Sequence, residues 1–166
     1  MTILAVDVQY NGDTSAQVAG IVVDDWNSNK IVESKSFKVS DVAPYESGEF
    51  YKRELPCIMA MLSCLETKPD IIIVDGYVDL GVGHPGLGRH LFDALGGKVQ
   101  VVGVAKTAFF SAAHAEVVHG TTSSKPVFVT AAGMDLDVAV DGVKRMAGPY
   151  RIPDLLKSVD SIARGR

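Results

Sequence analysis

Two aspartates stand at or near the ends of apolar runs that have the length of strands. Asp7 lies near the end of the run from Thr2 to Val8, and Asp75 directly follows Ile71–Val74. If these strands are neighbours in one sheet, both carboxylates project from the same rim, where like charges repel unless a cation lies between them. Mg²⁺ suits such a pair, because it takes few carboxylates and keeps several waters for its substrate. An aspartate at a strand end can also form a turn or cap a helix, so neither residue is decisive alone.

Two further charged residues can join this rim. Glu54, in PYESGEFYKRELP, lies near the start of an expected helix, where an acid also interacts favourably with the helix dipole. Lys106, in GVAKT, ends a second apolar run and is expected beside Asp75. The alternative for Lys106 is a lysine with a buried stem and a solvated tip.

The segment after Asp75 is rich in glycine and contains one histidine, His84. Its GVGHPG, from Gly81, matches the G-x-G-x-x-G pattern of dinucleotide-binding proteins. That match is weak, because five residues separate Asp75 from Gly81 and no acid ends the next strand. Loops mounted on a rigid strand often carry function, so this loop is a candidate site.

The periodicity of apolar residues predicts an α/β fold. Three strands at the start form an antiparallel meander, and two later strands with a helix between them form a right-handed parallel crossover. The expected strands are 2–8, 16–23, 30–38, 71–74, 99–104 and 127–130, and the expected helices are 49–65, 87–95, 136–146 and 153–163. Residues 107–124 receive no assignment.

Length and composition indicate an ordinary globular protein. With 166 residues, 47% apolar and 22% charged, we expect a single domain over residues 1–166. No apolar run is long enough to cross a membrane, and MTILAVDV has neither a basic lead nor a cleavage site, so we expect a cytoplasmic protein without a membrane partner. The net charge of −4 argues against a general nucleic-acid coat protein, although bound cations or a local basic patch still permit nucleic-acid binding.

Six segments, taken in order, resemble those of endonuclease V. They are VDVQY with Asp7, PYESGEFYKRE ending in Glu54, IIIVDG with Asp75, GHPGLGRHL with His84, GVAK with Lys106, and RIPDLLKSVD ending in Asp160. The resemblance implies an RNase H-like fold, a mixed sheet in which three antiparallel strands are followed by parallel strands, with helices on both faces.

The resemblance also implies an activity and a set of site residues. The activity is cleavage of phosphodiester bonds 3′ of deoxyinosine, inosine or other deaminated bases in DNA or RNA, with Mg²⁺ or Mn²⁺ as cofactor. Asp7, Glu54 and Asp75 would be the metal ligands, and Asp160 would take the fourth acidic position. Lys106 would lie near the scissile phosphate and offset charge that develops in the transition state.

The substrate contacts implied by the resemblance lie in two loops. Pro44 and Tyr45 begin PYES, at the place of the family's strand-separating PYIP wedge. Gly76 and Gly83 would let the backbone approach a flat base. His84 would lie near water or phosphate, or would simply hold the loop in place.

The chain departs from the family in the surface that grips the substrate. PYES places Glu46 where nucleic acid should approach, and HPG has Gly86 in place of an arginine. A single-stranded or RNA substrate needs less wedging and fewer phosphate contacts. The alternatives are an RNase H-like module that binds nucleic acid or nucleotide without cleaving it, and an interaction protein whose acids only form turns.

Overall fold

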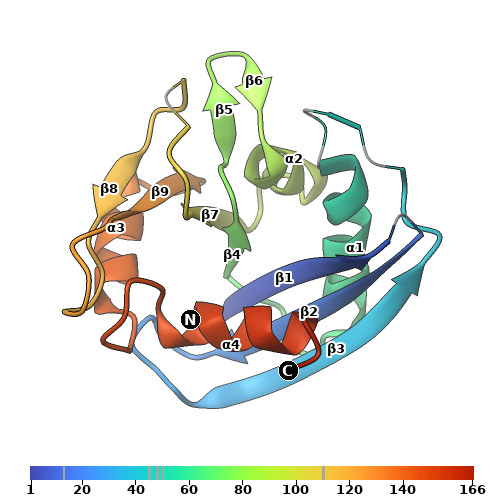
Figure 1. Ribbon diagram of the computed structural model, residues 1–166, viewed down its shortest axis with the longest axis horizontal. Helices are drawn as coiled ribbons and strands as arrows, with labels where there is room; N and C mark the ends of the chain where they lie inside the picture. The colour runs from blue at the N-terminus through green and yellow to red at the C-terminus, as the bar shows by residue number, and fades with distance from the viewer. Residues whose placement is uncertain (13, 45, 48, 50, 110) are drawn as a thin grey trace.

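A seven-stranded sheet with helices on both faces organises the part of the chain that the structure describes (Figure 1). The computed structural model describes residues 1–12, 14–44, 46–47, 49, 51–109 and 111–166. Its sheet has the order β3-β2-β1-β4-β7-β9-β8. The strands are β1 (Ile3–Asn11), β2 (Ser15–Val23), β3 (Ile31–Ser40), β4 (Ile71–Asp75), β7 (Gln100–Ala105), β8 (Ala115–Val117) and β9 (Val127–Ala132).

The pairing of the strands confirms the predicted meander and crossover. Strands β1, β2 and β3 are antiparallel, whereas β4 is parallel to both β1 and β7. The strand predicted over 127–130 is β9, and it runs antiparallel to β7. No helix is found in the described part of the connection between them, so the chain returns without the crossover that a parallel pair needs. The unassigned segment supplies β8, a short strand at the edge of the sheet.

The glycine-rich loop after Asp75 folds partly into a hairpin that the sequence did not predict. Its two short strands, β5 (Asp79–Gly81) and β6 (His84–Pro85), pair with each other and form a separate sheet. In Figure 1 this hairpin projects from the body of the molecule beyond the end of β4.

In the described part of the chain, four helices cover the two faces of the large sheet. α1 (Tyr51–Cys64) and α2 (Leu87–Ala94) pack on one face, against side chains such as Leu4 and Ile72. α3 (Leu136–Arg145) and α4 (Asp154–Ala163) pack on the other, against side chains such as Ile3 and Ile73. Helices on both faces of a mixed sheet, after an antiparallel meander, give the RNase H-like fold that was predicted. Among the described residues, no helix is long and apolar enough to span a membrane.

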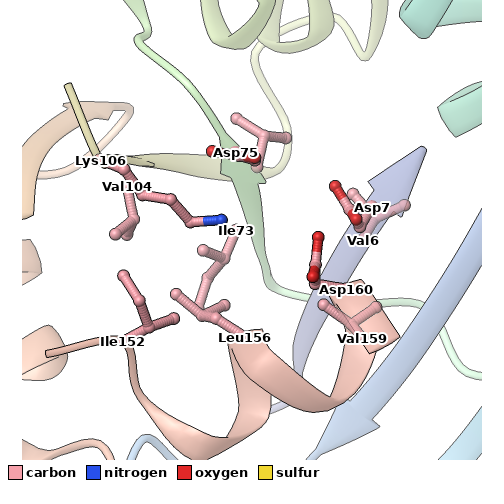
Figure 2. A pocket seen from close by; sticks show the side chains of 11 residues that line it. Val6, Asp7, Ile73, Asp75, Val104, Lys106, Ile152, Leu156, Val159 and Asp160 are labelled. Atoms are coloured by element: carbon pink, nitrogen blue, oxygen red, sulfur yellow. The ribbon is translucent and has the colours of Figure 1, made fainter. Parts of the chain in front are cut away.

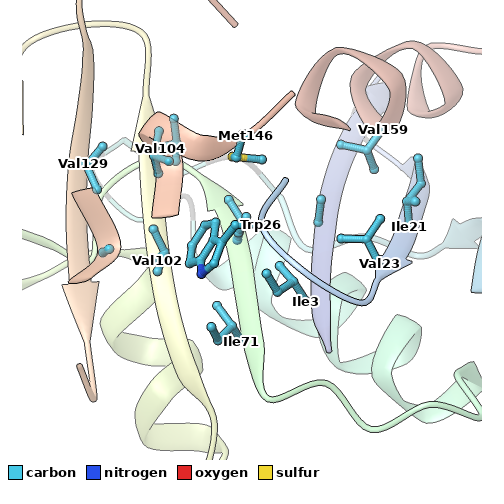
Figure 3. Close-up of a cluster of buried hydrophobic side chains, with 14 of the residues drawn as sticks. Ile3, Ile21, Val23, Trp26, Ile71, Val102, Val104, Val129, Met146 and Val159 are labelled. Atoms are coloured by element: carbon cyan, nitrogen blue, oxygen red, sulfur yellow. The ribbon is translucent and has the colours of Figure 1, made fainter. Parts of the chain in front are cut away.

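Trp26 fills the layer between the sheet and α3 (Figure 3). Its indole is 4% exposed and lies so close to α3 that a Cβ at Gly142 would come within 2.3 Å of it. Since such a contact is shorter than any real Cβ contact, only glycine lets the helix approach this far. The approach also brings Val143 and Ala139 onto the core, where both are fully buried.

Gly142→Ala should therefore lower the free energy of unfolding by about 1–3 kcal/mol, as overpacked cores do. In a chain of this size each kcal/mol corresponds to about 2–4 °C in melting temperature. The matched control is Val138→Ala on the exposed side of the same helix, which should change stability by less than about 0.5 kcal/mol. Equal melting temperatures for the two variants would contradict the packing of α3 on Trp26.

Candidate active site

Three charged side chains reach the α4 side of the sheet because of the alternation of residues along each strand. In β1 the core residues Ile3 and Ala5 face α3 and α4, so Asp7 faces the same way. The same alternation follows Ile71 and Ile73 to Asp75 in β4, and Val102 and Val104 to Lys106 after β7. Three neighbouring strands thus place two acidic side chains and one cationic side chain on the same face of the sheet.

The register of the sheet then brings the two aspartates level. Strands β1 and β4 are parallel and pair as far as Ala5 and Ile73, so Asp7 and Asp75 each lie two residues beyond the last residue of that pairing. Asp75 itself pairs with Val104 of β7, and Lys106 follows two residues later. The ends of parallel strands meet at one edge of the sheet. The predicted rim of charged residues is therefore present.

Asp160 of α4 completes this group from the adjoining helix layer. Asp7, Asp75, Lys106 and Asp160 line one pocket, whose remaining walls are apolar (Figure 2). In that view the carboxyls of Asp7 and Asp160 lie side by side. The apolar walls are Val6, Ile73, Val74, Val104, Ile152, Leu156 and Val159.

Glu54 approaches the same edge from the opposite face of the sheet. It lies in the first turn of α1, in the helix layer that covers Val6 and Val74. Together with Asp75 and Gly76 it lines a second pocket, whose other walls are Tyr51, Tyr77, Leu80, Pro85, Gly86 and Leu87. Asp75 belongs to both pockets and so connects the two halves of the site.

Burial and repulsion from neighbouring acids raise the pKa values of Asp7 and Glu54. Burial, followed by the charges of Asp75 and Asp160, raises the pKa of Asp7 to about 6, although a hydrogen bond from Gln9 opposes the shift. Burial, followed by the charges of Asp75 and Asp7, raises the pKa of Glu54 to about 8. Asp7 and Glu54 are therefore each influenced by neighbouring acids, and perturbed carboxyls of this kind cluster at functional sites.

The pKa of Asp75 is also raised. Its residue is exposed at the end of β4, but surrounding protein atoms shield the carboxyl from bulk water, which is the largest cause of the shift. The Lys106 ammonium opposes the shift, and the charge of Asp160 adds to it. Lys106 thus offsets part of the repulsion at the rim.

Two polar side chains that the sequence analysis missed hold the acids in place. Gln9 donates from Nε2 to Oδ2 of Asp7 (3.0 Å) and to Oδ1 of Asp160 (3.3 Å), so one amide joins β1 to α4. Arg164 donates from Nε to both carboxylate oxygens of Asp160 (3.1 and 2.9 Å). Both could have been found from spacing, since i and i+2 share a strand face and i and i+4 share a helix face.

Arg53 is a buried cation next to Glu54. It is 7% exposed, and its guanidinium lies 4.0 Å from the centre of the Tyr10 ring. Its Nε and Nη2 atoms have no hydrogen-bond partner among the residues that the structure describes. The charge of Arg53 opposes the rise in the pKa of Glu54, so the two side chains partly neutralise each other.

Arg151 fixes the backbone that carries Lys106. Its guanidinium donates to the carbonyl oxygen of Lys106 and, from Nε and Nη2, to that of Pro126 at 3.1 and 2.7 Å. Because Arg151 lies three residues before the start of α4, it joins the end of β7 to the segment that leads into the helix with Asp160.

The other predicted site residues lie apart from the carboxylates. Gly83 and His84 are exposed on the hairpin, outside the pockets lined by Asp75, whereas Gly76 lines two of these pockets. Pro44 is exposed before α1, and Tyr45 lies outside the described residues. Among the residues that the structure describes, no three Asp, Glu, His or Cys side chains are close enough together to hold a metal ion.

Comparison with known proteins identifies the family. The model of the endonuclease V family matches residues 1–124. The chain therefore belongs to the endonuclease V family. Endonuclease V of Streptomyces avermitilis is 32% identical over 186 aligned residues, which cover 98% of this chain and 79% of that protein. Endonuclease V of Trichormus variabilis is 27% identical, with 99% and 82% covered.

Solved structures of endonuclease V share the fold. The S. avermitilis crystal structure aligns with a TM-score of 0.79 at 26% identity, covering 99% of this chain and 80% of that one. Endonuclease V of Ciona intestinalis, crystallised with a 23mer DNA that contains an inosine followed by a ribo-adenosine, aligns with a TM-score of 0.81 at 20% identity, covering 99% and 84%. The chain is thus a nuclease of the endonuclease V type.

Glu54→Gln should stabilise the metal-free protein, and more so as the pH rises. The folded state raises the pKa of Glu54 from 4.5 to about 8, so ionisation opposes folding progressively between these values and fully above them. In EDTA, the melting temperature of the variant minus that of the parent should increase from pH 5 to pH 8, by about 2–4 °C for each kcal/mol of relieved repulsion.

The control for this measurement is Glu116→Gln, since Glu116 is exposed on β8 away from the acids. Its difference from the parent should stay constant over the same pH range. A constant difference for Glu54→Gln as well would contradict the electrostatic picture of the site.

Proposed function

We propose that this protein is a metal-dependent endonuclease that cleaves phosphodiester bonds 3′ of inosine or other deaminated bases. The observation that carries the proposal is the convergence of Asp7, Asp75, Asp160 and Lys106 on one pocket at the edge of the sheet. Membership of the endonuclease V family and the likeness to a protein crystallised with inosine-containing DNA support it.

The chemistry of the donors at this edge suits a hard divalent cation, although no three of the described acids lie close enough together here to hold one, so binding would draw them together. The acids supply only oxygen donors, and burial, followed by repulsion among them, raises the pKa values of three carboxyls. A divalent cation would relieve that repulsion. Asp7, Glu54 and Asp75 would hold Mg²⁺ or Mn²⁺, with Asp160 as the fourth acid. When bound, the cation supplies positive charge that polarises the phosphodiester and activates water.

The protein's own side chains then have separate roles. The exposed ammonium of Lys106 offsets charge that develops on the phosphate. Gln9 keeps the carboxyls of Asp7 and Asp160 oriented, and Arg151 holds the backbone of Lys106. The pocket beside Gly76, which Tyr51 and Tyr77 also line, is the place where a base could lie next to the acids. Gly83, His84, Pro44 and Tyr45 remain predicted substrate contacts.

The charge of Glu46 is partly offset within its own segment. Lys52 lies 3.1 Å from a carboxylate oxygen of Glu46 and 2.7 Å from one of Glu49, so one ammonium serves both acids. All three side chains are exposed, and salt screens such pairs. A single-stranded or RNA substrate, which needs little wedging, is compatible with this surface, and we propose it as the preferred strand type.

Mn²⁺ should raise the melting temperature of the protein, because a ligand that binds only the folded state stabilises it by mass action. The shift should grow with the logarithm of the Mn²⁺ concentration and should be reduced in Asp7→Asn. Asp24→Asn, at an exposed position after β2, should respond as the parent does. An identical response in all three proteins would show that the predicted ligands do not bind the metal.

Cleavage of end-labelled oligonucleotides tests the function itself. We expect nicking of strands that contain one inosine, but not of inosine-free strands, in Mg²⁺ or Mn²⁺ and none in EDTA. Asp75→Asn should lose at least about a hundredfold in rate, the usual scale for a lost electrostatic contribution of this kind. The substrates should include single-stranded DNA, duplex DNA and RNA, with Asp24→Asn as the control variant.

The result also separates this proposal from its alternative. Protein that binds Mn²⁺ and oligonucleotides but nicks none of the substrates would be an RNase H-like module kept for binding.

A further inference from the structure

The hairpin β5–β6 presents an apolar side chain at its tip. Val82 connects the two strands and is fully exposed, at 102%. Gly81 and Gly83 on either side adopt φ values of +150° and +74°, which other residues rarely reach. A single exposed apolar residue is ordinary on a protein surface. Val82 differs because the hairpin that carries it is anchored at its base and lies next to the candidate active site.

The base of the hairpin is fixed to two parts of the fold. Arg89 of α2 donates to both carboxylate oxygens of Asp79, at 3.2 and 3.0 Å. The backbone of Val78 donates to Oγ1 of Thr130 in β9 at 2.9 Å, and its carbonyl accepts from Gly86 at 2.9 Å. Paired strands with an anchored base form a stiff support, so Val82 keeps its position when a partner presses on it.

The hairpin is continuous with the candidate active site. Leu80 and Pro85, one on each side of the hairpin, line the pocket that contains Glu54 and Asp75. Val82 lies two residues beyond Leu80, which corresponds to about 7 Å along a strand. Stacked nucleotides follow one another at about 3.4 Å along a strand, so the tip lies about two nucleotides from one held in the pocket.

The charge of the hairpin permits a polyanion to approach. Residues 80–86, LGVGHPG, contain no carboxylate, and the one acid at its base, Asp79, is neutralised by Arg89. His84 is exposed in β6 and can donate a hydrogen bond to phosphate. This neutral segment differs from the segment before α1, where Glu46 and Glu49 share one lysine.

Apolar side chains that proteins insert between base steps unstack the bases and open the duplex locally. We infer that the β5–β6 hairpin is a finger that inserts Val82 between neighbouring bases about two nucleotides from the scissile site. This inference rests on the proposed function, because it takes nucleic acid cut at Asp75 as the partner. The finger would allow a deaminated base in a duplex to be reached, in addition to one in a single strand.

The test compares Val82→Ser with Val82→Leu on matched substrates. Since Val82 is fully exposed, neither change should alter folding. With one inosine in the same sequence, Val82→Ser should lower the single-turnover rate on duplex DNA by about tenfold and that on single-stranded DNA by less than about twofold. Val82→Leu, which keeps an apolar tip, should retain the parent's rate on both substrates. Equal losses on the two substrates, or no loss, would overturn the finger.

A second measurement does not depend on cleavage. In Ca²⁺, a duplex with 2-aminopurine two nucleotides from the inosine should brighten when the parent or Val82→Leu binds, because the reporter base becomes unstacked. The increase should be lost in Val82→Ser at saturating protein. A parent that brightens the duplex without nicking any substrate would refute the proposed cleavage and keep the finger. Equal brightening by Val82→Ser would overturn the finger whatever the cleavage result.

Discussion

Repulsion among carboxylates at one edge of the sheet is the constraint that shapes the rest of this molecule. Asp7, Asp75, Glu54 and Asp160 come from two strands and two helices, and their charges act on one another. A fold that gathers such groups must offset their repulsion or lose stability. The surrounding cations and amides do so in part, and the Gln9 amide ties β1 to α4.

These stabilising contacts differ between the two faces of the sheet. On the α4 side, Gln9 joins the first strand to the last helix. Arg151, in the segment before that helix, donates a hydrogen bond to the backbone of Lys106. On the α1 side, Arg53 is buried against Tyr10 and its charge acts on Glu54, but two of its nitrogens find no hydrogen-bond partner in the described part of the chain. Buried donors without partners are costly. This cost is consistent with an arrangement kept for its electrostatics rather than for stability.

Much of this arrangement was predictable from local patterns. The apolar runs before Asp7, Asp75 and Lys106 fix both the strands and the direction of the three side chains, because alternation along a strand leaves no choice of face. The meander and the crossover followed from the order of the strands. The position of Asp160 came only from the resemblance to endonuclease V, since an acid in an amphipathic helix carries no signal of its own.

The rest depends on contacts that a local pattern does not contain. The hairpin was missed because DLGVGHP is short and rich in glycine, and its strands exist only through the anchors at Asp79 and Val78. β8 and the direction of β9 were missed because residues 107–124 have no clear period and depend on pairing with the finished sheet. Arg53 contacts Tyr10, and Arg151 donates to Lys106 and Pro126. These partners are far away in the sequence, so the spacing of residues along a strand or helix could not reveal the contacts.

The acids come from both helix layers, and this has a consequence for a chain that is only partly folded. Asp7, Asp75 and Lys106 face the layer of α4, whereas Glu54 arrives with α1 from the other side of the sheet. A nascent or partly opened chain that lacks either layer holds an incomplete set of acids. Hydrolysis of nucleic acid would then be confined to the fully folded protein. Local unfolding of α1 would abolish activity before the sheet itself unfolds.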